Sequence, residues 1–236
     1  MSLLLGVLCS IIAILLIYDG VVAKTGGESM LQNIVDHKLF NGAAYLREFV
    51  NPAQPEIQKI AKTLKKDTPM ETTKNIYNWF ENGYSYATDS IVITNGKKVV
   101  FVGNNDTWNL PVQTLAEKRQ GTMKIDCEDG TFAMVSLLRA DGINAWANIG
   151  TVVIKGETYG HAWVTVVLNG KTYLLETTRG APLDGFHSVP NIYHPEFTFN
   201  EKRVHATLGA NINRKRPSPI PPEKIPELKE ILDKQP

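Results

Sequence analysis

Cys127, His161 and Glu176 are the side chains in this sequence that could together carry out nucleophilic chemistry. A thiolate attacks a carbonyl carbon well when an imidazole beside it takes its proton, and a carboxylate can fix the tautomer of that imidazole. The chain has 2 cysteines, and Cys9 lies in the apolar N-terminal segment, so Cys127 has no disulfide partner in the remaining chain. The alternative role of Cys127 is that of a small buried apolar residue. The histidine and the acid downstream favour the nucleophile.

Residues 126–142 predict a helix whose first turn contains Cys127. Asp126 is a good N-cap residue, and Asp129 lies three residues later in the position of a capping-box carboxylate. In the middle of the helix only Ser136 interrupts the apolar residues, so the helix is expected to run through a core. The unpaired backbone N–H groups and the dipole at its first turn favour a thiolate over a thiol.

A β-hairpin is predicted around Asn169-Gly170, because this residue pair favours a type I′ turn. Its strands are residues 163–168 and 171–178. Positions equidistant from the turn face each other, so His161 falls opposite Thr178 and diagonally near Glu176. The Glu176 carboxylate is therefore a candidate to accept the imidazole N–H.

Three short motifs resemble the transglutaminase-like superfamily, the papain-like acyl-transfer enzymes with a Cys-His-Asp triad. The motifs lie at residues 126–129, 160–164 and 173–176, and the similarity extends over residues 72–178. The resemblance implies an α+β papain-like transglutaminase core, in which a central helix carrying the cysteine packs on an antiparallel sheet. It also implies that Cys127 is the nucleophile, that His161 is the general base and acid, and that Glu176 occupies the usual place of aspartate.

Asp126, Glu128 and Asp129, here called the acidic collar, surround the nucleophile with negative charge. A carboxylate about 5 Å from a thiolate opposes its ionisation by about 3 kcal/mol at an effective dielectric near 20. One interpretation is that the collar caps the helix and points into water. The other rests on a resemblance to bacterial transglutaminase-like cysteine proteinases, in which acidic neighbours of the nucleophile bind calcium, a hard cation that prefers oxygen ligands. Thioester chemistry itself requires no cofactor.

Gln113 and Trp108 are upstream donors that could help the Cys127 backbone N–H to bind the oxyanion formed during attack. Their alternative roles are those of a helix-capping glutamine and a core tryptophan.

The first 23 residues differ in composition from the rest of the chain. Residues 3–18 are almost continuously apolar, and residues 21–23 suit cleavage by signal peptidase. This pattern predicts a signal peptide or an N-terminal membrane anchor, and thus a domain that is secreted or held at the membrane outside the cytoplasm. If uncleaved, the segment makes the membrane a partner. The net charge of +1 and the absence of a basic stripe argue against a nucleic-acid partner.

Four parts of the chain are expected. They are a signal peptide or anchor at 1–23, a helical extension at 24–68, a transglutaminase-like catalytic domain at 69–186, and a C-terminal extension at 187–236 with a basic Pro-rich linker and a short helix. Thr68, Pro69 and Glu71 predict a helix start where the catalytic domain begins. Asn95-Gly96 predicts a second hairpin over residues 91–102.

These features predict an exported or membrane-anchored thiol hydrolase or acyltransferase that acts on amide bonds through a Cys127 thioester. A peptidase or amidase is favoured, with a protein or peptide substrate and cell-envelope material as a plausible target because of the export signal. The alternative is a non-catalytic transglutaminase-like module that binds protein or glycan. A third hypothesis, a metal site of Cys127 with histidines, lacks paired ligand spacing.

Overall fold

The computed structural model describes residues 43–82, 85–87, 93–94, 98–99, 108–119, 124–178, 186–210 and 217–234. The predicted signal peptide or anchor and most of the predicted 91–102 hairpin lie outside these residues. Of that hairpin the structure describes the antiparallel pair β2 (Ile93–Thr94) and β3 (Lys98–Val99). None of the helices in the described part of the chain has the length and apolar character needed to cross a bilayer.

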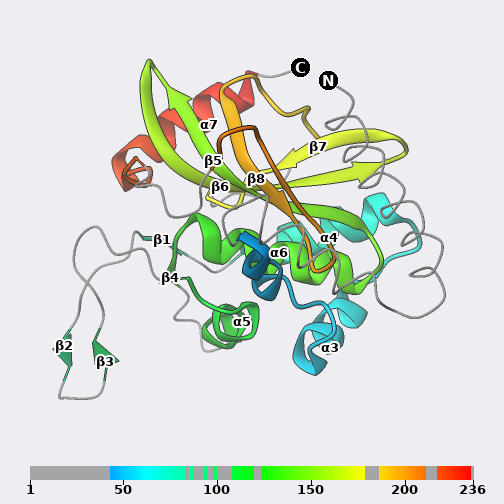
Figure 1. The fold of residues 1–236 in the computed structure, drawn as a ribbon. Coiled ribbons are helices and arrows are strands. Elements are labelled where there is room, and N and C mark those ends of the chain that lie inside the picture. Colours follow the sequence, from blue (N-terminus) through cyan, green and yellow to red (C-terminus); the bar gives the residue numbers. More distant parts are fainter. Residues whose placement is uncertain are drawn as a thin grey trace, which may run out of the picture.

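The centre of the fold is a five-stranded antiparallel sheet with the strand order β7-β6-β5-β8-β9 (Figure 1). Its strands are β5 (Asn144–Ile154), β6 (Glu157–Leu168), β7 (Lys171–Leu175), β8 (Tyr193–Phe199) and β9 (Val204–Ala206). The predicted turn between β6 and β7 is confirmed, because Asn169 and Gly170 both have positive φ, at 51° and 75°. Val164 pairs with Leu175, which fixes the register that carries Glu176 toward His161.

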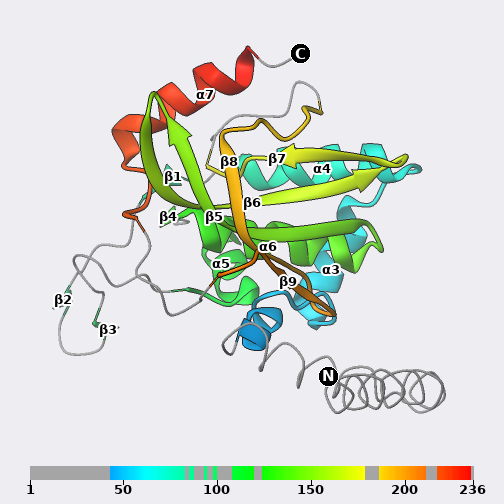
Figure 2. The same cartoon turned by 45° about the horizontal axis from the view of Figure 1, so that its top comes forward.

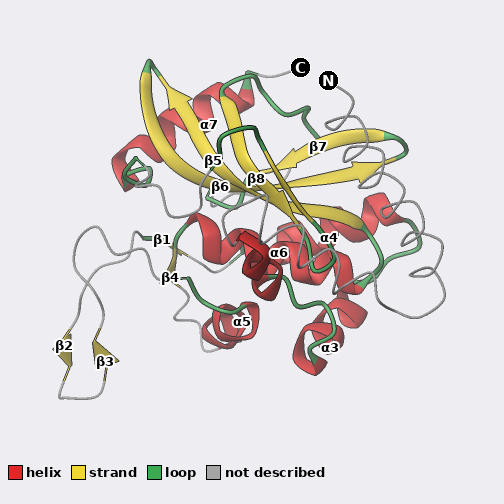
Figure 3. Ribbon diagram, in the orientation of Figure 1, coloured by secondary structure: helices red, strands yellow, loops and turns green. Residues whose placement is uncertain are grey.

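Helix α6 (Cys127–Ala140) packs beneath this sheet and is buried from Cys127 to Leu138, as its apolar sequence predicts. The remaining helical elements are η1 (Ala43–Phe49), α3 (Pro55–Leu64), α4 (Pro69–Glu81), α5 (Pro111–Arg119), η2 (Pro222–Lys224) and α7 (Ile225–Asp233). Figure 2 shows α6, α3 and α5 on one side of the sheet and α7 on the other, and Figure 3 separates the helices from the strands by colour. The predicted α+β architecture is confirmed.

Ser136, the polar residue in the middle of α6, connects this helix to the N-terminal part of the fold. Its hydroxyl donates to the Phe132 carbonyl at 2.8 Å and accepts the Asn51 backbone N–H at 3.0 Å. Apolar side chains of η1, of α3 and of the segment between them are buried in the same core as α6. They are Ala43, Leu46, Val50, Ile57 and Ala61. The chain before α4 is therefore packed into the central core.

Helix α4 begins with the predicted capping box. The Thr68 hydroxyl accepts the Glu71 backbone N–H at 3.2 Å, and the Glu71 carboxylate accepts the Thr68 backbone N–H at 3.2 Å. One turn and a half later, Tyr77 is buried and donates its hydroxyl to the Glu176 carbonyl oxygen at 2.6 Å. The helix thus supports the chain just beyond β7.

The face of the sheet opposite α6 is covered at one end by the C-terminal helix. Trp163, Val152 and Ile154 from the sheet form a buried cluster with Leu228 and Leu232 of α7. The short C-terminal helix expected from the sequence is confirmed, and it docks on the domain itself.

Candidate active site

His161 and Glu176 form a hydrogen bond inside the protein. His161 Nε2 lies 2.9 Å from Glu176 Oε2, and both side chains are buried. Since an ionised carboxylate only accepts hydrogen bonds, Nε2 carries the proton. The hairpin geometry expected from the Asn169-Gly170 turn thus brings the two residues together, diagonally across β6 and the end of β7.

The Glu176 carboxylate is held by four hydrogen bonds. Oε2 accepts from His161 and from the Tyr193 hydroxyl at 2.8 Å, while Oε1 accepts the Thr178 backbone N–H at 3.0 Å and hydroxyl at 2.8 Å. Burial alone would raise the pKa of Glu176, but the charge and hydrogen bond of His161 and the two bonds from Thr178 outweigh it and lower the pKa below its ordinary value. Glu176 is therefore an ionised, fixed acceptor for His161.

Tyr193 on β8 is a site residue that sequence reasoning missed. Its ring packs edge-on against Trp163 at 5.1 Å between centroids and lies 6.0 Å from the His161 ring. Burial, followed by the charge and hydrogen bond of Glu176, raises the pKa of Tyr193 well above its ordinary value, so the hydroxyl stays a donor. No local pattern around residue 193 indicates this role, because β8 joins the site only through pairing with β5.

Cys127 is the first residue of α6, as predicted, and is buried. Its sulfur donates to Glu128 Oε2 at 3.2 Å. The first turn of α6 packs against the chain that follows Glu176: a Cβ added at Gly130 would lie 3.0 Å from Thr177 Oγ1, and the Thr131 hydroxyl lies 3.5 Å from the same atom. The helix start and the end of β7 therefore adjoin.

Tyr86 on β1 (Ser85–Tyr86) lies within electrostatic range of both halves of the site. Burial raises the pKa of its phenol well above the ordinary value, and negative charges nearby raise it further, on Cys127, Asp126, Glu128 and Glu176. The pKa of this one side chain thus depends on charge at both Cys127 and Glu176. Strand β1 pairs in parallel with β4 (Lys124–Ile125), which leads directly into Cys127.

His161 Nδ1 is the ring nitrogen that Glu176 does not engage. It is buried and makes no hydrogen bond to any residue that the structure describes. Because Nε2 carries the proton, Nδ1 has a lone pair that can accept one. The imidazole therefore has one nitrogen fixed by Glu176 and the other ready for a proton transfer.

The acidic collar does not point into water, so this interpretation of the sequence is wrong. Asp126, Glu128 and Asp129 are all buried. Asp126 occupies the N-cap position but its side chain makes no capping hydrogen bond, and Asp129 accepts from the Asn109 backbone N–H at 2.8 Å and side-chain amide at 2.7 Å. The first turn of α6 is buried because the segment before α5 closes over it through Asn109.

The collar has the donor chemistry of a calcium site, since all its ligand atoms are oxygens. Within the described ranges, however, no group of three or more His, Cys, Asp or Glu side chains is arranged to hold a metal ion. Asp129 is also engaged by Asn109.

Gln113 and Trp108, the candidate oxyanion donors, make contacts that fit their alternative roles. Gln113 is exposed, and its amide oxygen accepts the Leu110 backbone N–H at 2.8 Å at the start of α5. Trp108 packs edge-on against Phe49 and Phe132, with ring centroids 5.2 and 5.4 Å apart. These are the capping and core roles considered as alternatives.

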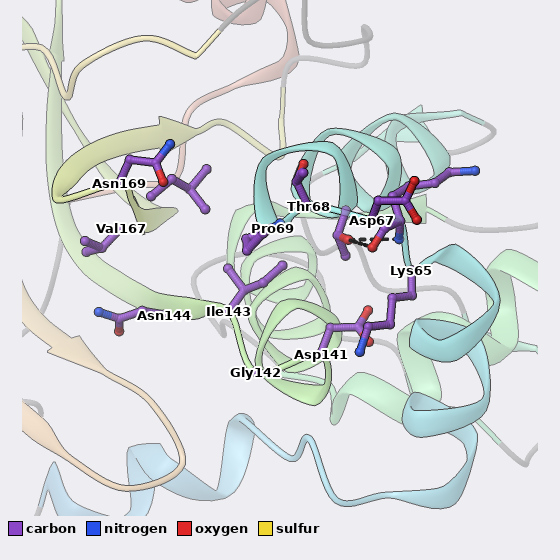
Figure 4. A pocket seen from close by; sticks show the side chains of 13 residues that line it. Lys65, Asp67, Thr68, Pro69, Asp141, Gly142, Ile143, Asn144, Val167 and Asn169 are labelled. Atoms are coloured by element: carbon purple, nitrogen blue, oxygen red, sulfur yellow. Dashed lines mark hydrogen bonds between the residues drawn. The ribbon is translucent and has the colours of Figure 1, made fainter.

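A cavity of about 430 Å³ lies at the opposite end of α6 from Cys127 (Figure 4). Its walls come from residues 65–69 with Thr72, from residues 141–144 and from residues 167–169. Helix α6 has 14 residues, which corresponds to about 21 Å between this cavity and the thiol. The cavity is not part of the candidate active site.

Comparisons with known proteins identify the family. The family model of the transglutaminase-like superfamily matches residues 58–175. A candidate cysteine protease from Cytophaga hutchinsonii is similar at 22% identity with a TM-score of 0.40, over 58% of this chain and 43% of that one. Legionella pneumophila LapG is similar at 17% identity with a TM-score of 0.43, over 64% of this chain and 86% of LapG.

A calcium-bound structure of LapG is also similar, at 17% identity with a TM-score of 0.39, over 75% of this chain and 97% of that one. This chain spans less than half of the Cytophaga protein. No curated protein sequence matches. At these identities the structural likenesses carry no information on the substrate. The family match covers half of the 236 residues and includes Cys127 and His161, which shows that this chain belongs to the transglutaminase-like superfamily.

Proposed function

We propose that this protein is a thiol hydrolase that cleaves amide bonds of protein or peptide substrates through a thioester on Cys127. The observation that carries the proposal is the buried His161–Glu176 hydrogen bond next to the start of α6. An imidazole that is fixed at Nε2 by a carboxylate and open at Nδ1 is the base that a cysteine nucleophile needs. Family membership supports a peptidase-type function in general.

In the proposed reaction the Cys127 thiol passes its proton to His161 Nδ1, and the sulfur forms a bond to the carbonyl carbon. The Cys127 backbone N–H, in the first turn of α6, is the proposed donor to the oxyanion. When the C–N bond breaks, the proton moves from His161 to the leaving amine. His161 then takes a proton from water, the hydroxide oxygen attacks the thioester, and the sulfur leaves with a proton.

Glu176 stabilises the imidazolium that forms during both proton transfers. The carboxylate lies 2.9 Å from Nε2, and Tyr193 and Thr178 keep the longer glutamate side chain in place where the family usually has aspartate. Water is the proposed acceptor because the site residues form no recognisable amine pocket.

We further propose that the domain acts outside the cytoplasm, secreted or held at the membrane by its N-terminal segment, on cell-envelope or extracellular material. Residues 3–18 and 21–23 support this part of the proposal by their composition. The chemistry requires no cofactor. Calcium at the acidic collar is a separate proposal, supported by the oxygen donors and by the existence of a calcium-bound LapG structure.

A non-catalytic binding module is the second candidate function. The Cys127 sulfur donates to Glu128, and a hydrogen bond to a carboxylate favours the protonated thiol. If this contact persists in solution, the domain retains the fold without nucleophilic chemistry.

Alkylation by iodoacetamide separates the two candidates. For an enzyme, the alkylation rate of Cys127 at neutral pH should fall in His161→Ala, because the base that takes the thiol proton is lost. His205→Ala is the matched control, since His205 lies on β9 beside Trp146, outside the site. Equal labelling rates in the wild type and His161→Ala would refute the enzyme and favour the binding module.

A further inference from the structure

The edge of β6 beside His161 is occupied by a segment from the C-terminal part of the chain. Strand β7 pairs with β6 only from Val164 to Leu168. Further toward the start of β6, the Gly160 backbone N–H donates to the Ser218 carbonyl at 2.9 Å, and Gly160 forms a parallel bridge with Pro219. Residues 217–220, here called the C-terminal strap, thus add to the sheet edge at the residue that precedes His161.

The close approach of the strap depends on a glycine. A Cβ at position 160 would lie 2.5 Å from the Pro217 carbonyl oxygen, a distance that real Cβ atoms do not adopt. The main chain of the strap is therefore in direct contact with the main chain of β6, as an added strand would be.

A second contact ties the strap to the nucleophile side of the site. The Tyr86 hydroxyl donates to the Ile220 carbonyl at 2.8 Å. The pKa of Tyr86 is raised by burial and, to a lesser extent, by nearby charges that include Cys127 and Glu176. A single phenol ring therefore connects the strap to the surroundings of the thiol.

One residue of the strap has a buried side chain, and the other three residues lie at the surface. Ile220 is fully buried against the cluster that contains Trp163 and Leu228, whereas Pro217, Ser218 and Pro219 are exposed. No further layer of described chain covers these three residues.

The candidate active site is closed to a substrate. Cys127, His161 and Glu176 are only 4%, 3% and 3% exposed. A carbonyl carbon must reach the Cys127 sulfur for any acyl transfer, so part of the chain around the site has to move. The strap packs beside the site, because Ile220 lies in one cluster with Trp163 and Tyr193, whose rings are each 6.0 Å from the His161 ring. It has an exposed outer side, a single buried side chain and a main-chain hydrogen bond to β6.

We propose that the C-terminal strap occupies the binding position of an extended substrate backbone and must be displaced before the thiol can be reached. The proposal rests on the proposed function and adds the substrate class: a polypeptide in extended conformation, bound through main-chain hydrogen bonds to Gly160 by strand addition. Such binding selects an unfolded or looped segment and excludes a compact, folded surface.

Two matched substitutions test whether the C-terminal strap limits access to Cys127. Ile220→Ala removes the anchor of the strap, and Ile154→Ala removes the same atoms from a fully buried position in the same cluster but on β5. We expect the alkylation rate of Cys127 and the amide exchange rate of Gly160 to rise on the order of tenfold in Ile220→Ala, because a core truncation of this kind favours local opening. Both rates should stay near wild type in Ile154→Ala.

Three results would overturn the proposal: wild-type labelling of Cys127 in Ile220→Ala, equal acceleration in both variants, or faster Gly160 exchange without faster labelling. A synthetic peptide with the sequence of residues 217–223 tests the substrate class when it is added to Ile220→Ala. This peptide should slow the alkylation of Cys127 and the exchange of Gly160 again. The same peptide with aspartate in place of isoleucine should slow neither rate. Equal effects of the two peptides would refute strand addition. Gly160 exchange does not depend on thiol reactivity, so failure of the proposed function leaves this readout intact.

Discussion

Replacing Glu176 with Gln tests whether the carboxylate sets the tautomer of His161. The carboxylate accepts at both oxygens, from His161 and Tyr193 on one side and from Thr178 on the other. An amide offers an oxygen at one end and an NH₂ donor at the other. The Thr178 backbone N–H cannot become an acceptor, so the amide oxygen should stay with Thr178 and the NH₂ group should face His161.

This orientation removes the base. His161 Nε2 must then accept from the amide, so the neutral ring carries its proton on Nδ1, where it cannot take one from Cys127. We expect turnover to fall on the order of 10⁴-fold, the size of the effect of an acid-to-amide change in a serine-protease triad. The exchange of a charged for a neutral acceptor in a buried site should also cost about 1–3 kcal/mol of stability.

The pH dependence of stability gives an independent measure of the same change. The pKa of Glu176 is lowered below its ordinary value of 4.5 in the folded protein, although burial alone would raise it. An acid with a lowered folded pKa gives stability that is fully present above the unfolded pKa and is lost as the pH falls through the folded pKa. The wild type should therefore lose stability below about pH 4.5, and Glu176→Gln should lose less.

The assays are iodoacetamide labelling of Cys127 across pH, turnover once a substrate is found, and urea unfolding at acidic and neutral pH. Glu176→Asp is the matched control, because it keeps the charge and has the residue usual in the family, and it should retain much of the labelling rate. Wild-type labelling of Glu176→Gln at every pH would refute the assignment of Glu176 as the partner that orients His161.

Three other outcomes are expected. Asn109→Ala should lower the free energy of unfolding by about 1–3 kcal/mol, because it removes the side-chain donor to the buried Asp129 carboxylate; a wild-type urea midpoint would contradict this. Calcium should raise the Tm of the full chain and EGTA should reverse the rise, since an ion at about 100 times its Kd stabilises by about 2.7 kcal/mol; an unchanged Tm would remove calcium from the acidic collar. Gln113→Ala should cost about 1 kcal/mol or less and leave turnover unchanged, because the side chain is exposed at a helix start; a large fall in turnover at an unchanged Tm would return Gln113 to the oxyanion hole.

The parts of the site that depend on local chain geometry could be predicted from the sequence. The apolar run after Asp126 determines that α6 is a core helix with Cys127 in its first turn. The Asn169-Gly170 turn fixes the register of β6 and β7, and this register alone brings Glu176 to His161.

The parts that depend on long-range pairing could not be predicted. Strand β8 contains Pro195, which argues against a strand because proline lacks a ladder N–H. The structure accommodates it where the pairing of β5 and β8 shifts between Ile149 and Gly150. A Cβ at Gly150 would lie 2.1 Å from the His194 carbonyl, so this glycine permits the approach that brings Tyr193 to Glu176.

The burial of the acidic collar has a similar origin. Asp126 and Asp129 have the sequence pattern of residues at a solvated helix start. Asn109, which is distant in sequence, covers that start in the folded chain. The local sequence around Cys127 contains no information on a contact with a residue as distant as Asn109.

The hydrogen bond from Asn51 to Ser136 has a consequence for where the domain can be cut. Ser136 lies in the middle of α6, and its partner belongs to the linker before α3. A shortened protein that starts at Pro69 would lack the apolar side chains of η1 and α3 and would open the lower side of α6 to water. The smallest autonomous folding unit therefore starts upstream of the first residue of α4, and the thiol keeps its place only while that upstream chain remains attached.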